Sequence, residues 1–170
     1  MVQQHVRGAQ ALAAGIAALP DTRSSAAYTQ AAWRFLNNDR VRLSELAKPL
    51  LSAVPELLDA HCERYGLVMH DWSRLNFGRH TSKTDRLKMT HKSDVGYELQ
   101  SSVLVSDASG KPLVPVVHNL VNDTQVHTTM HARPRAHQNH LDELSERIGW
   151  LEARGWDKPL VHIVDREGDS

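Results

Sequence analysis

Leu160-Val161-His162-Ile163-Val164 is a continuous apolar run that ends at Asp165, and such a run is typical of a buried, central strand of a sheet. A second run, Leu67-Val68-Met69-His70, ends at Asp71. We therefore predict two strands, each with an aspartate at its carboxyl end. If the strands lie side by side and run parallel, the two carboxylates meet at one end of the sheet.

The segment between these strands is predicted to contain a hairpin. Residues 97–105 alternate apolar with polar side chains, a period of two that is typical of a half-buried strand. Residues 107–112 favour a turn, and residues 113–117 begin the returning strand, so the hairpin spans 97–121. Pro115 cannot donate a ladder hydrogen bond, which indicates that the returning strand lies at a sheet edge.

A helix is predicted from about residue 135 to residue 154, because apolar side chains recur there at spacings of three and four residues. Gly155 provides its stop. The order from residue 66 is thus strand, hairpin, helix, strand. A ribonuclease-H-like core begins with this order of elements. In such a core the first and fourth strands lie side by side.

Residues 1–65 read as helical, since they are rich in Ala, Leu, Glu and Arg and lack strand-like alternation. A first helix is predicted to end at Leu19, a second to end at Leu36, and a third to begin at Ser44 and restart at Pro55. The predicted fold class is α+β. A helical domain of DNA-binding type at 1–65 precedes an incomplete ribonuclease-H-like α/β core with a mixed sheet at 66–170.

Composition narrows the class of protein. The 170 residues are 41% hydrophobic and 24% charged, which is typical of a globular chain. The longest apolar stretch, residues 11–19, is too short to cross a bilayer, so no membrane association is expected. Cys62 is the single cysteine; it excludes an internal disulfide, fits a reducing compartment and is expected to be a small buried side chain.

The net charge is zero, so composition as a whole gives no electrostatic argument for nucleic acid. The segment from Asp71 to Val95 is nevertheless locally basic, with six basic residues against three acids. Its side chains could contact the DNA backbone, which positions a substrate without reading its sequence; a solvated loop is the alternative. The six basic residues are Arg74, Arg79, Lys83, Arg86, Lys88 and Lys92.

Three segments resemble the insertion-sequence-four family of bacterial DDE transposases. Residues 164–169 (Val-Asp-Arg-Glu-Gly-Asp) resemble the D-R-E-x-D signature around the second acid of that family. Residues 71–77 (Asp-Trp-Ser-Arg-Leu-Asn-Phe) are similar to its first-acid segment, usually D-T-T-x-L, although Trp72 replaces the usual threonine. Residues 31–38 (Ala-Ala-Trp-Arg-Phe-Leu-Asn-Asn) resemble a stretch of its amino-terminal helical domain.

The resemblance implies a function. Asp71 and Asp165 would be the first two members of a metal-binding carboxylate triad that holds Mg²⁺ or Mn²⁺. Such enzymes cleave DNA at transposon ends and join the freed 3′ hydroxyl to target DNA. The implied partner is double-stranded DNA, at the transposon ends and the target, in a complex that could hold a homodimer, in the bacterial cytoplasm at the nucleoid.

The family's third acid belongs to a Y-(2)-R-(3)-E-(6)-K pattern, and that pattern is absent from these residues. Glu167 lies too close to Asp165 to approach from a separate helix. We therefore expect a chain truncated before its third catalytic acid.

Three other interpretations stay open. One is an inactive remnant that acts at most as a DNA- or partner-binding module, with an exposed sheet edge and exposed apolar surface. Another is a ribonuclease-H-type nuclease of a different family, which leaves the helical resemblance unexplained. A third is a zinc site formed by histidines, although Pro134 argues against the helix that would bring two of them together. The histidines considered are His127, His131, His137 and His140.

Overall fold

The computed structural model describes residues 25–88 and 94–165. Contacts between residues divide the chain into two compact units, Met1–Arg42 and Leu43–Ser170. In the first unit, helix α2 spans Ser25–Leu36, which confirms the second predicted helix. The helix predicted to end at Leu19 lies outside the described residues.

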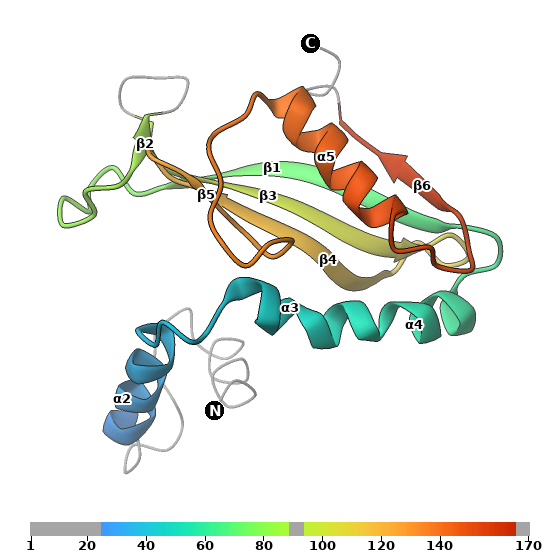
Figure 1. Cartoon of the computed structure of the whole chain (residues 1–170), viewed down its shortest axis with the longest axis horizontal. Coiled ribbons are helices and arrows are strands. Elements are labelled where there is room, and N and C mark those ends of the chain that lie inside the picture. Colours follow the sequence, from blue (N-terminus) through green and yellow to red (C-terminus); the bar gives the residue numbers. More distant parts are fainter. Residues whose placement is uncertain (1–24, 89–93, 166–170) are drawn as a thin grey trace. The chain divides into compact units, whose positions relative to one another are not determined.

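The second unit is built on a six-stranded mixed sheet with helices α3, α4 and α5 (Figure 1). Its main path runs β5-β4-β3-β1-β6, and β2 pairs with β3 beside that path. The neighbours β1, β3 and β4 are antiparallel, whereas β6 runs parallel to β1. The strands are β1 (Gly66–Asn76), β2 (Leu87–Lys88), β3 (Val95–Ser106), β4 (Pro112–Val121), β5 (Val126–Thr128) and β6 (Leu160–Ile163).

The α+β class, the hairpin and the adjacency of the first and last predicted strands are therefore confirmed. The prediction that the returning strand lies at a sheet edge is correct only for the part of β4 that contains Pro115, because β5 lies outside the other end of β4. In the described chain β4 has β5 as its outer neighbour only at Asn119–Val121, so Pro115 lies where the outer side of β4 needs no ladder donor.

Helices α3 (Leu43–Ser52) and α4 (Val54–His61) meet at the predicted break. Pro55 lies in the first turn of α4, where a missing backbone N–H costs nothing. Both helices belong to the unit that contains the sheet. The contacts thus divide the chain after Arg42, whereas composition predicts a boundary near residue 65.

The apolar core lies between α4, α5 and one face of the sheet. Its buried side chains come from α4, from the adjoining loop, from β1, β3 and β4, and from α5. Cys62 is 6% exposed and belongs to this core, as predicted. Burial of each such side chain contributes roughly 1.5–3 kcal/mol. The core residues are Val54, Leu58, Cys62, Val68, Leu104, Val114, Val116, Val117 and Leu151.

Helix α5 spans His140–Glu152, so the predicted start near residue 135 is wrong. Asn139 has an extended backbone and its side chain accepts a hydrogen bond from the Asp142 N–H, which satisfies one donor of the first turn. Arg135 instead pairs through its backbone with Val126. The spacing of apolar side chains predicted the helix correctly, and the N-cap Asn139 determines where the helix begins.

The prediction that the first strand ends at Asp71 is wrong, because β1 continues to Asn76. Its residues 72–76 pair with residues 96–100 of β3. This partner is distant in the sequence, and the local composition does not reveal it. Asp71 therefore lies in the middle of a strand.

The prediction that residues 160–164 form a central strand is also wrong. Among the described residues β6 has β1 as its only neighbour, and Val161 and Ile163 are each 39% exposed. A continuous apolar run records which side chains are apolar, and it does not identify the position of the strand in the sheet. No helix in the described ranges is long and apolar enough to cross a membrane.

Two glycines provide a stability test of this arrangement. A Cβ at Gly96 would lie 1.9 Å from the backbone oxygen of Leu75, whereas a Cβ at Gly149 would meet no atom within 4 Å. We expect Gly96→Ala to lower the free energy of unfolding by roughly 1–3 kcal/mol through overpacking. Gly149→Ala, inside α5, should raise it by up to about 1 kcal/mol. Urea unfolding of both variants checks the pair, and equal stabilities would contradict the β1–β3 geometry.

Candidate functional site

The register of the β1–β6 ladder matches the sequence separation of the two aspartates that the sequence singles out. Gly66 pairs with Leu160 and Met69 pairs with Ile163, so partners are 94 residues apart. Asp71 and Asp165 have the same separation. Asp165 follows the last residue of β6 by two positions, so a continuation of the register brings it level with Asp71.

Both aspartates are exposed. Along β1 the side chains of Val68, His70 and Trp72 are buried, whereas Met69 and Asp71 are exposed. This alternation places Asp71 on the face of the sheet that α5 does not cover. The Ser73 hydroxyl donates a hydrogen bond to Asp71 Oδ2, which orients that carboxylate on the strand.

A histidine pair lies on the covered face directly beneath this position. His70 Nε2 and His162 Nδ1 are 2.8 Å apart, and the two rings are stacked. Each histidine has a second partner: Ser102 Oγ is 2.9 Å from His70 Nδ1, and Glu152 Oε1 is 2.9 Å from His162 Nε2. The pair therefore joins β1, β3, β6 and α5 through side chains alone.

Arg147 of α5 is fully buried beside this pair. Its Nη1 donates to the Ser101 carbonyl oxygen at 3.0 Å, and its Nη2 donates to Glu143 Oε2 at 3.0 Å. Burial raises the pKa of Glu143, and the adjacent Arg147 opposes that rise. Burial likewise lowers the pKa of Arg147, and Glu143 opposes the fall. The two groups thus form an ion pair in which each compensates the desolvation of the other.

Burial, followed by the charge of Arg147 and then by His162, lowers the pKa of His70 from 6.5 to about 3. His70 is accordingly a neutral imidazole at physiological pH. Between His70 Nε2 and His162 Nδ1 one nitrogen donates and the other accepts. This hydrogen bond links two histidines on neighbouring strands.

The basic side chains of the segment Asp71–Val95 differ in their contacts and exposure. Arg86 Nη1 donates to the carbonyl oxygens of Phe77 and Gly78, and Lys83 lies over the rings of Phe77 and Tyr97, so both support the chain around β2. Arg79 and Lys88 are exposed.

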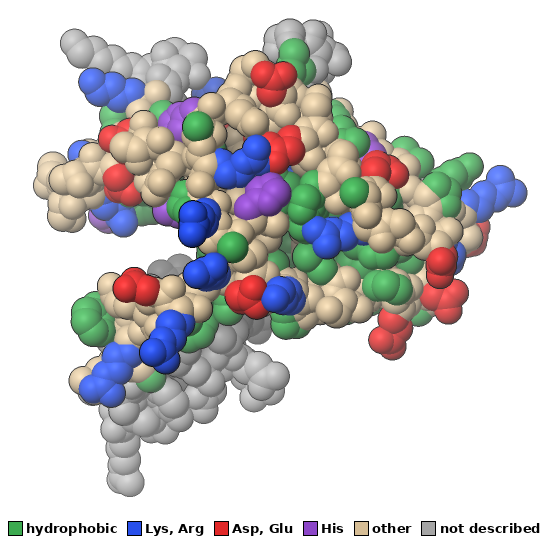
Figure 2. Space-filling model, viewed as in Figure 1, with side chains coloured by type: hydrophobic (Ala, Val, Ile, Leu, Met, Phe, Trp, Pro, Cys, Tyr) green, Lys and Arg blue, Asp and Glu red, His purple; other side chains and the backbone are tan. Residues whose placement is uncertain are grey.

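Arg74 is 4.0 Å from Asp94, and Lys92 lies outside the described residues. Figure 2 shows basic, acidic and histidine side chains interspersed over the visible face of the sheet-containing unit. That face therefore has no extended surface of only positive or only negative charge.

The histidines considered for zinc have separate partners. His131 lies 3.2 Å from Glu146, and His140 Nε2 lies 3.0 Å from Glu98. His127 contacts Gln125, and His137 lies in the exposed loop before α5. Within the described ranges no group of three or more His, Cys, Asp or Glu side chains could hold a metal ion. The two aspartates supply hard oxygen ligands of the type that Mg²⁺ prefers, and Mg²⁺ commonly takes only one or two carboxylates from a protein.

Sequence reasoning missed the buried polar groups of the covered face. Glu143 and Arg147 are four residues apart on the predicted helix, which is a detectable signal. Such pairs are common on solvent-exposed helix faces, however, so the spacing alone does not indicate burial. Comparisons with known proteins found no matching family model, no matching curated protein and no matching solved structure.

The Arg147–Glu143 pair can be tested by breaking it. We expect Arg147→Met to lower the free energy of unfolding by about 3–5 kcal/mol, because it leaves the Glu143 carboxylate buried and uncompensated. Replacing both residues with Met should cost less than the single change. Urea unfolding measures both variants. Lys48→Met, which removes an exposed pair with Glu45, is the control and should cost under about 1 kcal/mol.

His70 predicts a pH dependence of stability. Its pKa in the folded chain, about 3, lies below the unfolded value of 6.5, so its stabilising contribution is complete above pH 6.5 and is lost as the pH falls toward 3. We expect this group to remove roughly 1–2 kcal/mol between pH 7 and pH 5. The slope of unfolding free energy against pH should become shallower in His70→Asn. It should stay unchanged in the control His80→Asn, at an exposed position; equal slopes in all three proteins would contradict the assignment.

Proposed function

We propose that this chain is part of a DDE transposase that cleaves and joins double-stranded DNA, with Asp71 and Asp165 as two of its metal-binding carboxylates. The observation that carries the proposal is the register of the parallel β1–β6 pair. In this register, paired residues are 94 positions apart in the sequence, which is also the separation of Asp71 and Asp165. An extension of this ladder by two residues would align them on one exposed sheet face, and this support does not depend on the family resemblance.

The strand arrangement supports a ribonuclease-H-like assignment of the core. Three antiparallel neighbours in the order β4-β3-β1 are followed by α5 and then by β6, which lies parallel to β1. This is the order expected of the first four strands of such a core. In the proposal, β2 and the residues around it are an insertion between the first strand and its hairpin partner.

The proposed chemistry assigns distinct tasks to the residues. When bound, Mg²⁺ or Mn²⁺ would activate the attacking oxygen and stabilise the leaving oxygen in phosphoryl transfer. Asp71 and Asp165 would hold the ion, and Ser73 would orient the Asp71 carboxylate. His70 and His162 would act as positioning residues, because their hydrogen bond ties the two strands that carry the acids.

DNA contacts are assigned to the exposed basic side chains near β1 and β2. Arg79 and Lys88 are available to phosphate groups, and Arg74 lies on the same strand as Asp71. Arg86 and Lys83 have structural contacts, so in the proposal they shape the surface and bind DNA only indirectly. A third carboxylate within Y-(2)-R-(3)-E-(6)-K would have to come from outside these 170 residues.

A second candidate function is a non-catalytic binding module, the remnant interpretation. The observation that favours it is the apolar character of the face that carries the aspartates. Met69 of β1 is 48% exposed, and Val161 and Ile163 of the border strand β6 are each 39% exposed. Exposed apolar surface of this kind marks interaction sites or aggregation-prone surfaces.

Metal binding tests the first candidate. We expect Mn²⁺ titration calorimetry to give a saturable heat that weakens roughly tenfold or more in Asp71→Asn and in Asp165→Asn, since each change removes a ligand. Asp59→Asn, an equal charge change on the exposed side of α4, is the control. The same binding isotherm for all four proteins would exclude a metal site at these aspartates.

Sequencing the encoding DNA past codon 170 separates the two candidates. A downstream Y-(2)-R-(3)-E-(6)-K in frame, or restored by one frameshift, supports the transposase. Unrelated sequence together with Mn²⁺-independent DNA binding supports the binding module.

A further inference from the structure

The face of the sheet that α5 does not cover carries a polar row that includes Asp71. Asp71 of β1 pairs with Ser101 of β3, and Ser101 pairs with His118 of β4. Directly paired residues lie on the same face of a sheet, so these three side chains form a row across three neighbouring strands. The two adjoining rows are mostly apolar; they consist of Met69, Val103 and Pro115 on one side and of Ser73, Leu99 and Leu120 on the other.

The His118 imidazole has one nitrogen without a partner. Its Nδ1 lies 3.0 Å from Ser101 Oγ, whereas its Nε2 has no hydrogen-bond partner among the described residues. Burial, followed by the charge of Arg147, lowers the pKa of His118, so the ring is neutral at pH 7 and carries a single N–H. When the Ser101 hydroxyl donates to Nδ1, that hydrogen is on Nε2 and is available to an acceptor outside the chain.

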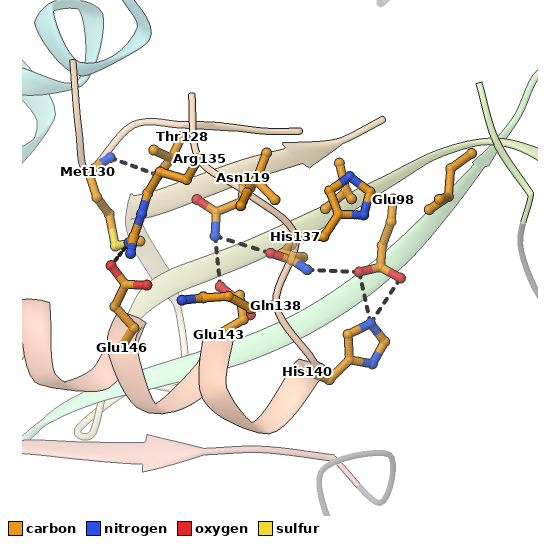
Figure 3. A pocket seen from close by; sticks show the side chains of 15 residues that line it. Glu98, Asn119, Thr128, Met130, Arg135, His137, Gln138, His140, Glu143 and Glu146 are labelled. Atoms are coloured by element: carbon orange, nitrogen blue, oxygen red, sulfur yellow. Dashed lines mark hydrogen bonds and ion pairs between the residues drawn. The ribbon is translucent and has the colours of Figure 1, made fainter. Parts of the chain in front are cut away.

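The polar groups of the α5-covered face differ from this row because most of them bind one another. They line a polar cavity of about 130 Å³ between the sheet and the amino-terminal half of α5 (Figure 3). Figure 3 shows the bonded pairs, which are Glu98 with His140, Asn119 with Glu143, and Arg135 with Glu146. Folding accounts for these pairs, since a buried polar group requires a partner. It does not account for the unpartnered Nε2 of His118.

We infer that His118 binds a phosphodiester group of the DNA substrate through Nε2, and that Ser101 is the positioning residue that orients its ring. The inference rests on the proposed function, which assigns a metal ion and DNA to this face at Asp71. Phosphate oxygens accept most of the hydrogen bonds that proteins donate to DNA, and an imidazole N–H is a suitable donor. His118 would thus hold the strand whose phosphate lies at the proposed metal site.

The spacing of the row suits a phosphate group between Asp71 and His118. Neighbouring strands are about 4.8 Å apart, so the Cα atoms of these two residues, two strands apart, are separated by about 10 Å. The contact with Ser101 directs the imidazole toward β3, which is also toward Asp71. Mg²⁺ lies about 2.1 Å from each of its oxygen ligands. A phosphate bound to an ion on Asp71 can therefore extend a second oxygen toward His118.

DNA binding tests the contact. The probe is a fluorescently labelled DNA duplex, titrated with the full chain in Mg²⁺ at pH 8, where an ordinary imidazole is neutral. An Asn side chain places its amide near the position of Nδ1, and a Gln side chain places it near that of Nε2. We therefore expect His118→Asn to weaken binding roughly tenfold and His118→Gln to weaken it at most about threefold. His61→Asn, the same change at an exposed position of α4, should leave the affinity unchanged.

Two further measurements separate a DNA contact from a structural role. Ser101→Ala, which removes the orienting hydroxyl, should weaken binding roughly threefold, and Ser101→Thr, which keeps a hydroxyl, should restore it. Long-range ¹H–¹⁵N spectra of the histidine rings locate the contact in the unmodified chain, where no folding defect interferes. We expect the duplex to shift the His118 Nε2 resonance more than the Nδ1 resonance.

The outcomes distinguish this inference from the proposed function. Equal affinities of His118→Asn and His61→Asn, or an unshifted Nε2 resonance, overturn the inference, even if Asp71→Asn abolishes the Mg²⁺-dependent part of binding and so supports the metal site. Weaker binding by His118→Asn with no effect of Asp71→Asn or of EDTA supports the phosphate contact and contradicts the metal site. An unmodified chain that does not bind the duplex overturns both.

Discussion

The burial of Arg147 is the constraint on which the α5-covered face of the sheet depends. Its guanidinium is fully buried and retains its charge at any physiological pH, so the interior must supply a carboxylate and further acceptors. Glu143 provides the carboxylate from one turn earlier on α5, and the Ser101 carbonyl provides an acceptor from β3. Rotation of α5 about its axis would break these contacts and move a charge into the apolar core around Leu151. The ion pair therefore fixes the orientation of the helix.

The inward side chains of β3 divide the covered face into two regions. Leu104 belongs to the apolar core, whereas Ser102, Gln100 and Glu98 follow at alternate positions toward the other end of the strand and are all buried. Each polar side chain requires a partner, which brings histidines, amides and the α5 charges together there. The polar cavity lies where this series ends at Glu98. A gradient along one strand thus separates the apolar part of the face, which holds the core, from its polar part.

Local pattern was sufficient to predict the hairpin and the helix before the last strand, because each depends on periodicity or turn chemistry within one short segment. The pairing of the first and last strands joins residues 94 positions apart, and it was predicted from the order of the elements, which is that of a ribonuclease-H-like core. The extension of β1 beyond Asp71 depends on partner residues 20 to 28 positions away in β3, and the border position of β6 depends on which strands lie beside it. The buried Glu143–Arg147 pair resembles a surface pair in sequence. Long-range pairing and burial, which single-sequence patterns do not contain, account for these errors.

The two faces of the sheet are coupled through strand register. Because side chains alternate along a strand, His70 on the covered face dictates where Asp71 lies on the exposed face. A slip of β6 by one residue would exchange its two faces. A slip by two would keep the faces, but it would part His70 from His162 and bring Asp165 level with Met69 or Ser73 instead of Asp71. The partly buried hydrogen bond between His70 and His162 therefore opposes a slip of β6 against β1, so a contact on the covered face holds the register of the exposed face.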